Sequence, residues 1–194
     1  MVVMVRAACA CALLLVAGCA PRAFELGFWF EPVTFSASRI GGALTPDDLA
    51  TIRMTAAGEV TRAFTGLPVT ISDRPDARYR VRVVQDLGGP AGESHAVAGF
   101  GGSGAVNFSM LAGNAVAYAP PSAARDAIVS AIGRGVGASA VHEFAHQLLP
   151  TAPIDSDADR QSYEFASAGR AEQYYARLHW DLAWPLLLKR TGAR

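Results

Sequence analysis

Two long stretches of the chain carry apolar residues at the three- and four-residue spacing of a helix. The first follows Thr45-Pro46-Asp47-Asp48, where a capping threonine, a proline and two acids stand in the order typical of a helix start. Its apolar positions then recur up to Gly66 as Leu49, Ile52, Ala56, Val60 and Phe64. We therefore predict a helix over residues 45–66.

The second stretch begins after Ser122, which can cap a helix, and ends at Pro150, which stops one. Its apolar residues cover almost the whole helix surface: Ile128, Val129, Ile132, Val136, Ala140, Val141, Phe144, Ala145 and Leu148. Such a surface predicts a central, buried helix. Gly133, Gly135 and Gly137 weaken its middle and favour a break into two pieces.

Between these helices, shorter segments have the features of strands. Residues 68–71 form one candidate, and in residues 79–83 apolar side chains alternate with arginines in a second. Residues 88–104 are rich in glycine, which favours a hairpin or a flexible loop. Residues 113–119 resemble a further strand that ends at Pro120-Pro121.

Composition sets the size of the fold and excludes one class of partner. With 194 residues, 51% of them hydrophobic, the chain has the length and core-forming residues of one domain. Lys+Arg and Asp+Glu both number 17, and the arginines are scattered rather than clustered. We therefore expect no nucleic-acid partner, and we expect a monomer.

The beginning of the chain resembles a bacterial lipoprotein signal sequence. A short basic start is followed by an apolar stretch over residues 7–16 and by Leu15-Val16-Ala17-Gly18-Cys19, which resembles a lipobox. The resemblance implies that residues 1–18 are removed and that Cys19 carries lipid. By the same analogy, Ala20 favours the periplasmic side of the outer membrane of a bacterial envelope. The alternative is an ordinary signal peptide cut after Ala20.

All three cysteines, Cys9, Cys11 and Cys19, lie in this leader. A cysteine nucleophile or thiolate metal site in the mature body is thereby excluded. Residues 19–44 are expected to form an anchor and an aromatic N-terminal segment that packs on the domain. Residues 45–194 are expected to form the domain itself.

The most specific pattern in the chain is His142-Glu143-Phe144-Ala145-His146. On a helix, histidines four residues apart lie one turn above each other, so both rings can bind one metal ion. Glu143 is then placed to take a proton from a water activated by that metal. The chain has only 4 histidines, so chance rarely puts two of them at this spacing beside a glutamate.

This pattern is the HExxH signature of the zincin metallopeptidases, and the chain resembles that superfamily here. The resemblance implies an α+β, zincin-like fold, in which a small mixed or antiparallel sheet packs on the HExxH helix and C-terminal helices follow. It also implies zinc (Zn2+) at His142 and His146, and hydrolysis of a peptide or protein substrate with Glu143 as the catalytic base. In zincins, the last strand before this helix is a sheet edge that pairs with the substrate, which would be residues 113–119.

A catalytic zinc site needs a third protein ligand. The metzincin continuation HExxHxxGxxH is absent, and no methionine after Met110 offers a Met-turn. The gluzincin pattern takes a glutamate from the next helix, and helical sequence with Glu164 follows an acidic loop over residues 154–159. By this resemblance we predict Glu164 as the third metal ligand. Glu172, Asp159 and His179 are the alternatives.

The remaining candidates have less specific signals. Tyr163, Tyr174 and Tyr175 are positioned either to bind the oxyanion of the reaction or to pack in the core. His95 in the glycine-rich stretch is either a metal ligand or a solvated histidine. The function predicted is that of an envelope-anchored zinc peptidase. The alternatives are a non-catalytic lipoprotein with a structural or vestigial metal site, and an inactive peptidase descendant now used for binding.

Overall fold

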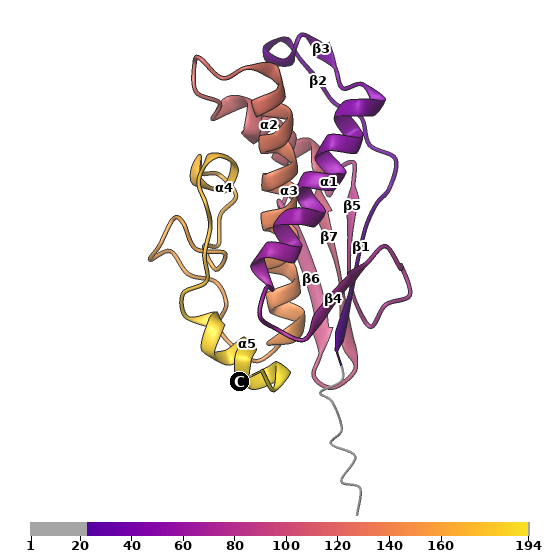
Figure 1. Cartoon of the computed structure of the whole chain (residues 1–194), viewed down its shortest axis with the longest axis vertical. Coiled ribbons are helices and arrows are strands. Elements are labelled where there is room, and N and C mark those ends of the chain that lie inside the picture. Colours follow the sequence, from indigo (N-terminus) through magenta and orange to yellow (C-terminus); the bar gives the residue numbers. More distant parts are fainter. Residues whose placement is uncertain (1–22, 194) are drawn as a thin grey trace, which may run out of the picture.

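The computed structural model describes residues 23–193, and over this range the chain is an α+β domain (Figure 1). The predicted signal segment (residues 1–18) and the predicted lipidation site, Cys19, lie outside the described residues. The main sheet contains β1 (Phe24–Phe30), β4 (Val69–Ser72), β5 (Tyr79–Val84), β6 (Gly92–Val97) and β7 (Gly101–Asn107). The helices are α1 (Pro46–Ala63), α2 (Phe108–Ala117), α3 (Arg125–Leu148), α4 (Glu172–Tyr175) and α5 (Ala183–Thr191). A small hairpin of β2 (Ser36–Ala37) and β3 (Gly42–Ala43) encloses a 3-10 turn, Ser38–Ile40.

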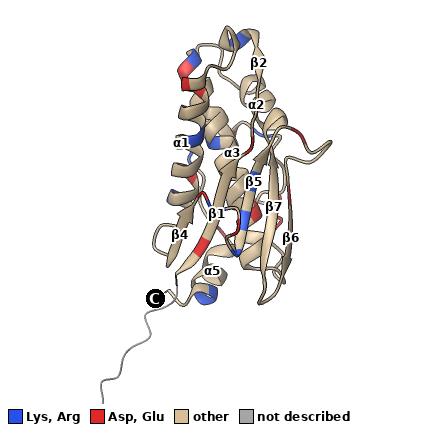
Figure 2. Cartoon of the chain, turned by 90° about the vertical axis from the view of Figure 1, so that its right-hand side faces the viewer, with Lys and Arg blue, Asp and Glu red and all other residues tan. Residues whose placement is uncertain are grey.

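The main sheet is mixed, and its strand order is β4-β1-β5-β7-β6. The first four strands are parallel to their neighbours, whereas β6 runs antiparallel to β7 and forms one edge. Helices α1 and α3 lie against one face of this sheet (Figure 2). The predicted strands at 68–71 and 79–83 are confirmed as β4 and β5, and the glycine-rich stretch is confirmed as a hairpin, β6–β7.

The predicted strand at residues 113–119 is wrong, because most of this segment belongs to α2. The helix begins at Phe108, directly after the last residue of β7, and the side chain of that residue, Asn107, accepts a hydrogen bond from the Met110 amide at 3.1 Å. This cap satisfies one of the free amides of the first turn. Leu111, Ala112 and Ala115 then follow at helical spacing and are fully buried.

The predicted start of α1 is confirmed in detail. Thr45 and Asp48 form a reciprocal capping box around the first turn. The Asp48 carboxylate also accepts two hydrogen bonds from Arg125, at 2.5 and 2.6 Å. Because this guanidinium stabilises the charged carboxylate, the pKa of Asp48 is held well below its usual range. The pair ties the beginning of α1 to the beginning of α3.

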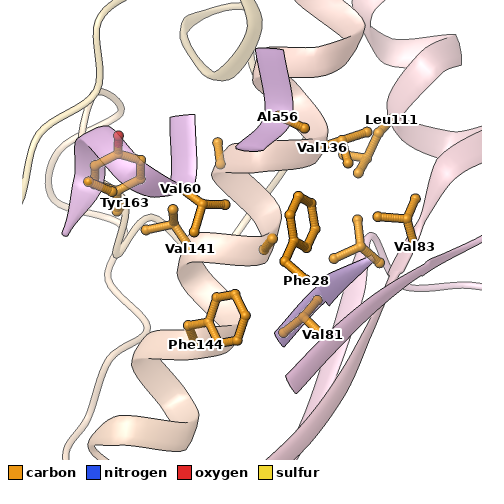
Figure 3. Packing of buried hydrophobic residues seen from close by; sticks show 14 of the residues in the cluster. Phe28, Ala56, Val60, Val81, Val83, Leu111, Val136, Val141, Phe144 and Tyr163 are labelled. Carbon is orange, nitrogen blue, oxygen red and sulfur yellow. The ribbon is translucent and has the colours of Figure 1, made fainter. Parts of the chain in front are cut away.

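Helix α3 is continuous, so the predicted break at its glycines is wrong. The glycines instead let neighbouring elements approach closely. A Cβ added at Gly133 would lie 2.8 Å from the carbonyl oxygen of Ile52, and one at Gly137 would lie 2.7 Å from that of Ala56. Both faces of α3 are therefore buried, between α1 and the sheet, and Figure 3 shows Phe144 within this core cluster.

The C-terminal region contains less helix than its sequence predicts. Turns and bends replace the helix expected around Glu164, and the helices at the C-terminal end of the described chain are two short ones, α4 and α5. Pro185 lies in the first turn of α5, where its missing amide costs no hydrogen bond. No helix in residues 23–193 is long and apolar enough to cross a membrane.

Substitution of Gly137 by alanine tests the close packing of α3 on α1. The added Cβ would lie 2.7 Å from both the Ala56 carbonyl oxygen and Glu59 Cβ. Overpacking costs roughly 1–3 kcal/mol, and the higher helix propensity of alanine returns only about 1 kcal/mol. We expect Gly137→Ala to lower the free energy of unfolding by up to about 2 kcal/mol, as measured by urea denaturation.

The matched control is Gly58→Ala on α1. Gly58 is exposed, and nothing lies within 4 Å of its added Cβ. Here only the propensity changes, so we expect a stabilisation of about 0.5–1 kcal/mol. Equal stabilisation by the two substitutions would contradict the close helix contact.

Candidate metal centre

The two histidines of the HExxH sequence lie one turn apart near the end of α3, as the helical spacing predicts. Their Nε2 atoms are 3.1 Å apart, and the two rings are nearly perpendicular. The side chain of His142 is largely buried, while that of His146 is about one third exposed. Both rings therefore offer a nitrogen to the same point at the surface of the helix.

Asp155 completes a group of three possible metal ligands. Its Oδ1 lies 3.1 Å from Nε2 of His142 and 3.4 Å from Nε2 of His146. The residue is nine positions after His146, in a loop that leaves α3 at Pro150 and turns back. Ile154 is buried beside it and holds the loop to the core. The three donor atoms form a nearly equilateral triangle.

The other ring nitrogen of His142 is held by the protein. Its Nδ1 lies 2.8 Å from the carbonyl oxygen of Tyr163, which can only accept a hydrogen bond. In the neutral ring the proton therefore sits on Nδ1, and Nε2 carries the lone pair that a metal needs. When the ring is protonated, Nε2 instead donates a hydrogen bond to Asp155 at 3.1 Å. The loop that carries Tyr163 thus selects the tautomer of His142.

Burial and charge shift the pKa values of the three groups in different directions. Burial lowers the pKa of His142. The hydrogen bond to Asp155 and the negative charge of Glu143 raise this pKa by more than burial lowers it, so the net shift is upward. Burial lowers the pKa of His146, and the neighbouring His142 adds to the effect. The hydrogen bond to His142 lowers the pKa of Asp155, which therefore stays a carboxylate at neutral pH.

Glu143 is a buried carboxylate beside this triangle. Its side chain packs against the beginning of β6, where a Cβ added at Gly92 would lie only 2.4 Å from Glu143 Oε1. Burial raises the pKa of Glu143 to about 7. A carboxylate with a pKa near neutrality is suited to both accept and release a proton at that pH.

The histidines, Glu143 and Asp155 line an open cleft of about 640 Å³. One wall is the segment from Gly89 to Ser94, which leads into β6, and the opposite wall is the loop from Phe165 to Arg170. The hydroxyl of Ser94 donates to the carbonyl oxygen of Glu143 at 3.3 Å, which joins the strand to α3. A free strand edge therefore borders the candidate metal centre.

Gln147 fixes the end of α3 on the sheet. Its buried side-chain amide donates to the Arg80 carbonyl oxygen and accepts from the Arg80 amide, both at 3.0 Å. This contact requires a glycine opposite it, because a Cβ at Gly102 would lie 2.5 Å from Gln147 Cγ. The residue directly after His146 is thus locked in place, which fixes the height of the metal centre above the sheet.

The structure does not bring Glu164 to the histidines. Its buried carboxylate instead accepts hydrogen bonds from the Ser162 hydroxyl and from the amides of Asp181, at 3.0 Å, and Ala183. These amides begin α5, where a negative charge is stabilised by the free amides and the helix dipole. The prediction of Glu164 as a ligand placed it on a helix that does not form, and Asp155 occupies the position expected for it.

The alternative ligands are also engaged elsewhere. Glu172 pairs with Arg160 at 2.9 Å, and Asp159 pairs with His179 at 2.9 Å. His95 is exposed on β6 and is not part of the group. The three candidate tyrosines also bind elsewhere. The Tyr163 hydroxyl donates to Glu59 and accepts from Arg62. The hydroxyls of Tyr174 and Tyr175 donate to the carbonyl oxygens of Ala168 and Ala115. These tyrosines therefore pack and hold the core.

Three residues that sequence reasoning missed shape this site: Asp155, Gly92 and Gln147. For Asp155 a signal existed, since a loop bounded by Pro150 and Pro153 is short enough to return an acid to the end of α3. Gly92 and Gln147 gave none, because their roles depend on which strand lies beneath the helix.

No family model, curated protein or solved structure matches the chain. The resemblance to zincins accordingly rests on the HExxH residues, and the assignment of a third ligand rests on the geometry of this site.

Paired substitutions separate the role of Asp155 from that of Glu164. Asp155→Asn removes a charged oxygen from the triangle. Loss of a residue that only supports a ligand lowers metal affinity roughly 10- to 100-fold, and we expect this substitution to lower zinc affinity by more than that. Glu164→Gln should change zinc affinity by less than this. It should instead lower the free energy of unfolding by about 1–3 kcal/mol, since buried amides lose a charged acceptor.

Zinc affinity is measured by competition with a chromophoric chelator, and stability by urea denaturation of the zinc-free protein. A large loss of zinc affinity in Glu164→Gln together with none in Asp155→Asn would restore the original ligand prediction.

Proposed function

We propose that the chain is a zinc-dependent peptidase of zincin type, anchored to the bacterial cell envelope by lipid on Cys19. The observation that carries the proposal is the position of Glu143, a buried carboxylate beside three convergent metal-binding side chains in an open cleft. A structural zinc site is normally closed by four protein ligands, whereas a catalytic one has three and an open position. Three donors within a cleft favour the catalytic kind.

The donor set fits zinc in its chemistry and in its dimensions. Two imidazole nitrogens and a carboxylate oxygen are among the ligands that zinc prefers. Around a tetrahedral zinc with bonds of about 2.0–2.1 Å, ligand atoms lie roughly 3.3 Å apart. The three separations here, 3.1, 3.1 and 3.4 Å, are close to that value. The hydrogen bond from His142 to Tyr163 supports the required tautomer.

In the reaction we propose, the residues of the chain move protons and orient the substrate. Zinc, when bound, polarises the peptide carbonyl and lowers the pKa of a water molecule. Glu143 accepts a proton from the attacking water and donates it to the leaving amine. Its burial favours this exchange, because a carboxylate with a pKa near 7 is a better proton acceptor than an exposed one.

The edge of β6 supports a peptide substrate. This strand pairs with β7 on one side only, and its beginning lines the cleft opposite residues 165–170. An extended peptide can add to such an edge through main-chain hydrogen bonds. We therefore assign the substrate-pairing role to β6 in place of residues 113–119, and we propose peptides or unfolded segments as substrates.

Glu143→Gln separates catalysis from metal binding. Glutamine keeps the shape of the side chain but cannot accept a proton, so we expect hydrolysis of a fluorogenic peptide library to fall by at least a factor of roughly 100. Zinc content, measured by mass spectrometry of the metal, should stay near one per chain because Glu143 is not a ligand. Undiminished hydrolysis in this variant would contradict the proposed role of Glu143 as the base.

Gly92→Ala tests the positioning of Glu143 by β6. The added Cβ would lie 2.4 Å from Oε1, so the carboxylate must move. Since a displacement of about 1 Å can cost as much as 100-fold in rate, we expect kcat to fall by a factor of roughly 10 to 100 with zinc content unchanged.

Gly89→Ala is the matched control for this substitution. Gly89 lines the same cleft, but nothing lies within 4 Å of its added Cβ. We expect kcat close to that of the parent protein. An equal loss in the two variants would show that the contact with Glu143 is not the cause.

A further inference from the structure

Exposed apolar side chains gather at one end of the molecule, which we call the hairpin end. It comprises the β6–β7 turn (residues 97–101), the beginning of β1 and helix α5 (Figure 1). Among the large hydrophobic residues, four of the most exposed lie on the turn and on α5: Phe100 at 84%, Leu182 at 65%, Val97 at 63% and Leu186 at 40%. Leu182 and Leu186 are one helical turn apart and so share a face.

The strand registers place the turn and the beginning of β1 at the same end. Leu26 of β1 is paired with Tyr79, and Tyr79 is paired in turn with Gly102. Gly102 then pairs with Ala96 of β6. The first residues of β1 and the turn that carries Phe100 are therefore level, separated by three strand spacings, or roughly 14 Å.

Helix α5 lies at this end as well. The Arg190 side chain donates to the Tyr79 hydroxyl at 3.2 Å and to the Leu148 carbonyl oxygen at 3.1 Å. A groove between α5 and the β6–β7 turn is lined by Ala98, Gly99, Leu186 and Lys189, among others. The two cations of α5, Lys189 and Arg190, line this groove together with the exposed Leu186.

The chain length before β1 limits how far this end can be from a membrane. Only five residue steps separate Cys19 from Phe24, the first residue of β1. Even fully extended, five residues span at most about 18 Å. A lipid on Cys19 therefore keeps the beginning of β1 within that distance of the bilayer surface. The Phe100 turn, level with it along the strands and roughly 14 Å away, then lies at most about 32 Å from that surface.

We propose that the hairpin end docks on the bilayer into which the lipid of Cys19 inserts. Phe100 and Val97 enter the interfacial region, where aromatic and aliphatic side chains gain by leaving water. Leu182 and Leu186 contact the same region, and Lys189 meets anionic headgroups. This inference rests on the proposed lipidation and is independent of the proposed hydrolysis.

Docking fixes how the metal centre faces the membrane. His146 lies two residues before the end of α3, and the end of α3 contacts α5 at the hairpin end. A second groove runs from Val97 and Phe100 to His146. The docked orientation thus puts the metal centre in the membrane-proximal half of the molecule, with a groove leading toward it from the bilayer side.

The test uses the full lipidated chain with one labelled thiol at a time. After removal of residues 1–18 and lipidation of Cys19, no free cysteine remains, so Phe100→Cys provides a unique attachment site. The label is a polarity-sensitive fluorophore, and the protein is reconstituted in vesicles of phosphatidylethanolamine and phosphatidylglycerol. We expect a blue-shifted emission that brominated lipids quench.

Ser122→Cys is the matched control, because Ser122 is exposed just before α3 at the opposite end. The 24 residues of α3 separate it from the hairpin end by about 36 Å. Its label should emit as in water and resist quenching. Equal emission and equal quenching of the two labels would overturn the docking.

A second label, at Leu186→Cys, tests the contribution of α5 separately. Quenching at this position supports the docked surface as described, whereas its absence overturns the role given to α5. Mass spectrometry of the mature N-terminus checks the premise, and an unmodified Cys19 would overturn the inference. Zinc content of the same samples reports on the metal centre, so failure of docking and failure of the proposed peptidase are distinguishable.

Discussion

The close burial of α3 is the constraint on which the rest of this structure depends. A helix with apolar residues all round needs neighbours on every side, and here the neighbours come within contact distance of its backbone. Gly133 and Gly137 admit the backbone of α1, and Gly135 admits the ring of Tyr174. Glycine in a helix interior costs about 1 kcal/mol of propensity, which the dispersion contacts of close packing offset.

The same close packing continues from the helix to the sheet and positions the candidate metal centre. Glu143 and Gln147 fit against β6 and β7 only because Gly92 and Gly102 have no side chains. These contacts hold the last turns of α3 rigidly over the edge of the sheet. The buried Glu143 and the two histidines can then keep one arrangement without a disulfide, since residues 20–194 contain no cysteine.

The loop after α3 supplies two groups of the candidate metal centre that the helix does not carry. Asp155 brings the third donor, and Tyr163 offers the carbonyl oxygen that orients His142. Buried polar contacts hold this loop: Arg170 donates to the carbonyl oxygens of Ser162, Phe165 and Ser167, and Glu164 binds the beginning of α5. Glu164 therefore acts on the candidate metal centre from a distance, because it helps to fix the loop whose backbone carbonyl binds His142.

The sequence by itself determined the elements whose causes are local. The cap at Thr45, the alternation in β5 and the helical spacing of His142 and His146 depend on residues within one or two turns, so they were predicted correctly. Tertiary structure decided the rest. Asp155 rather than Glu164 lies beside the two histidines, and β6 rather than residues 113–119 is the strand at the edge near them. Both depend on how loops return across the sheet, which is set by contacts between residues far apart in the chain.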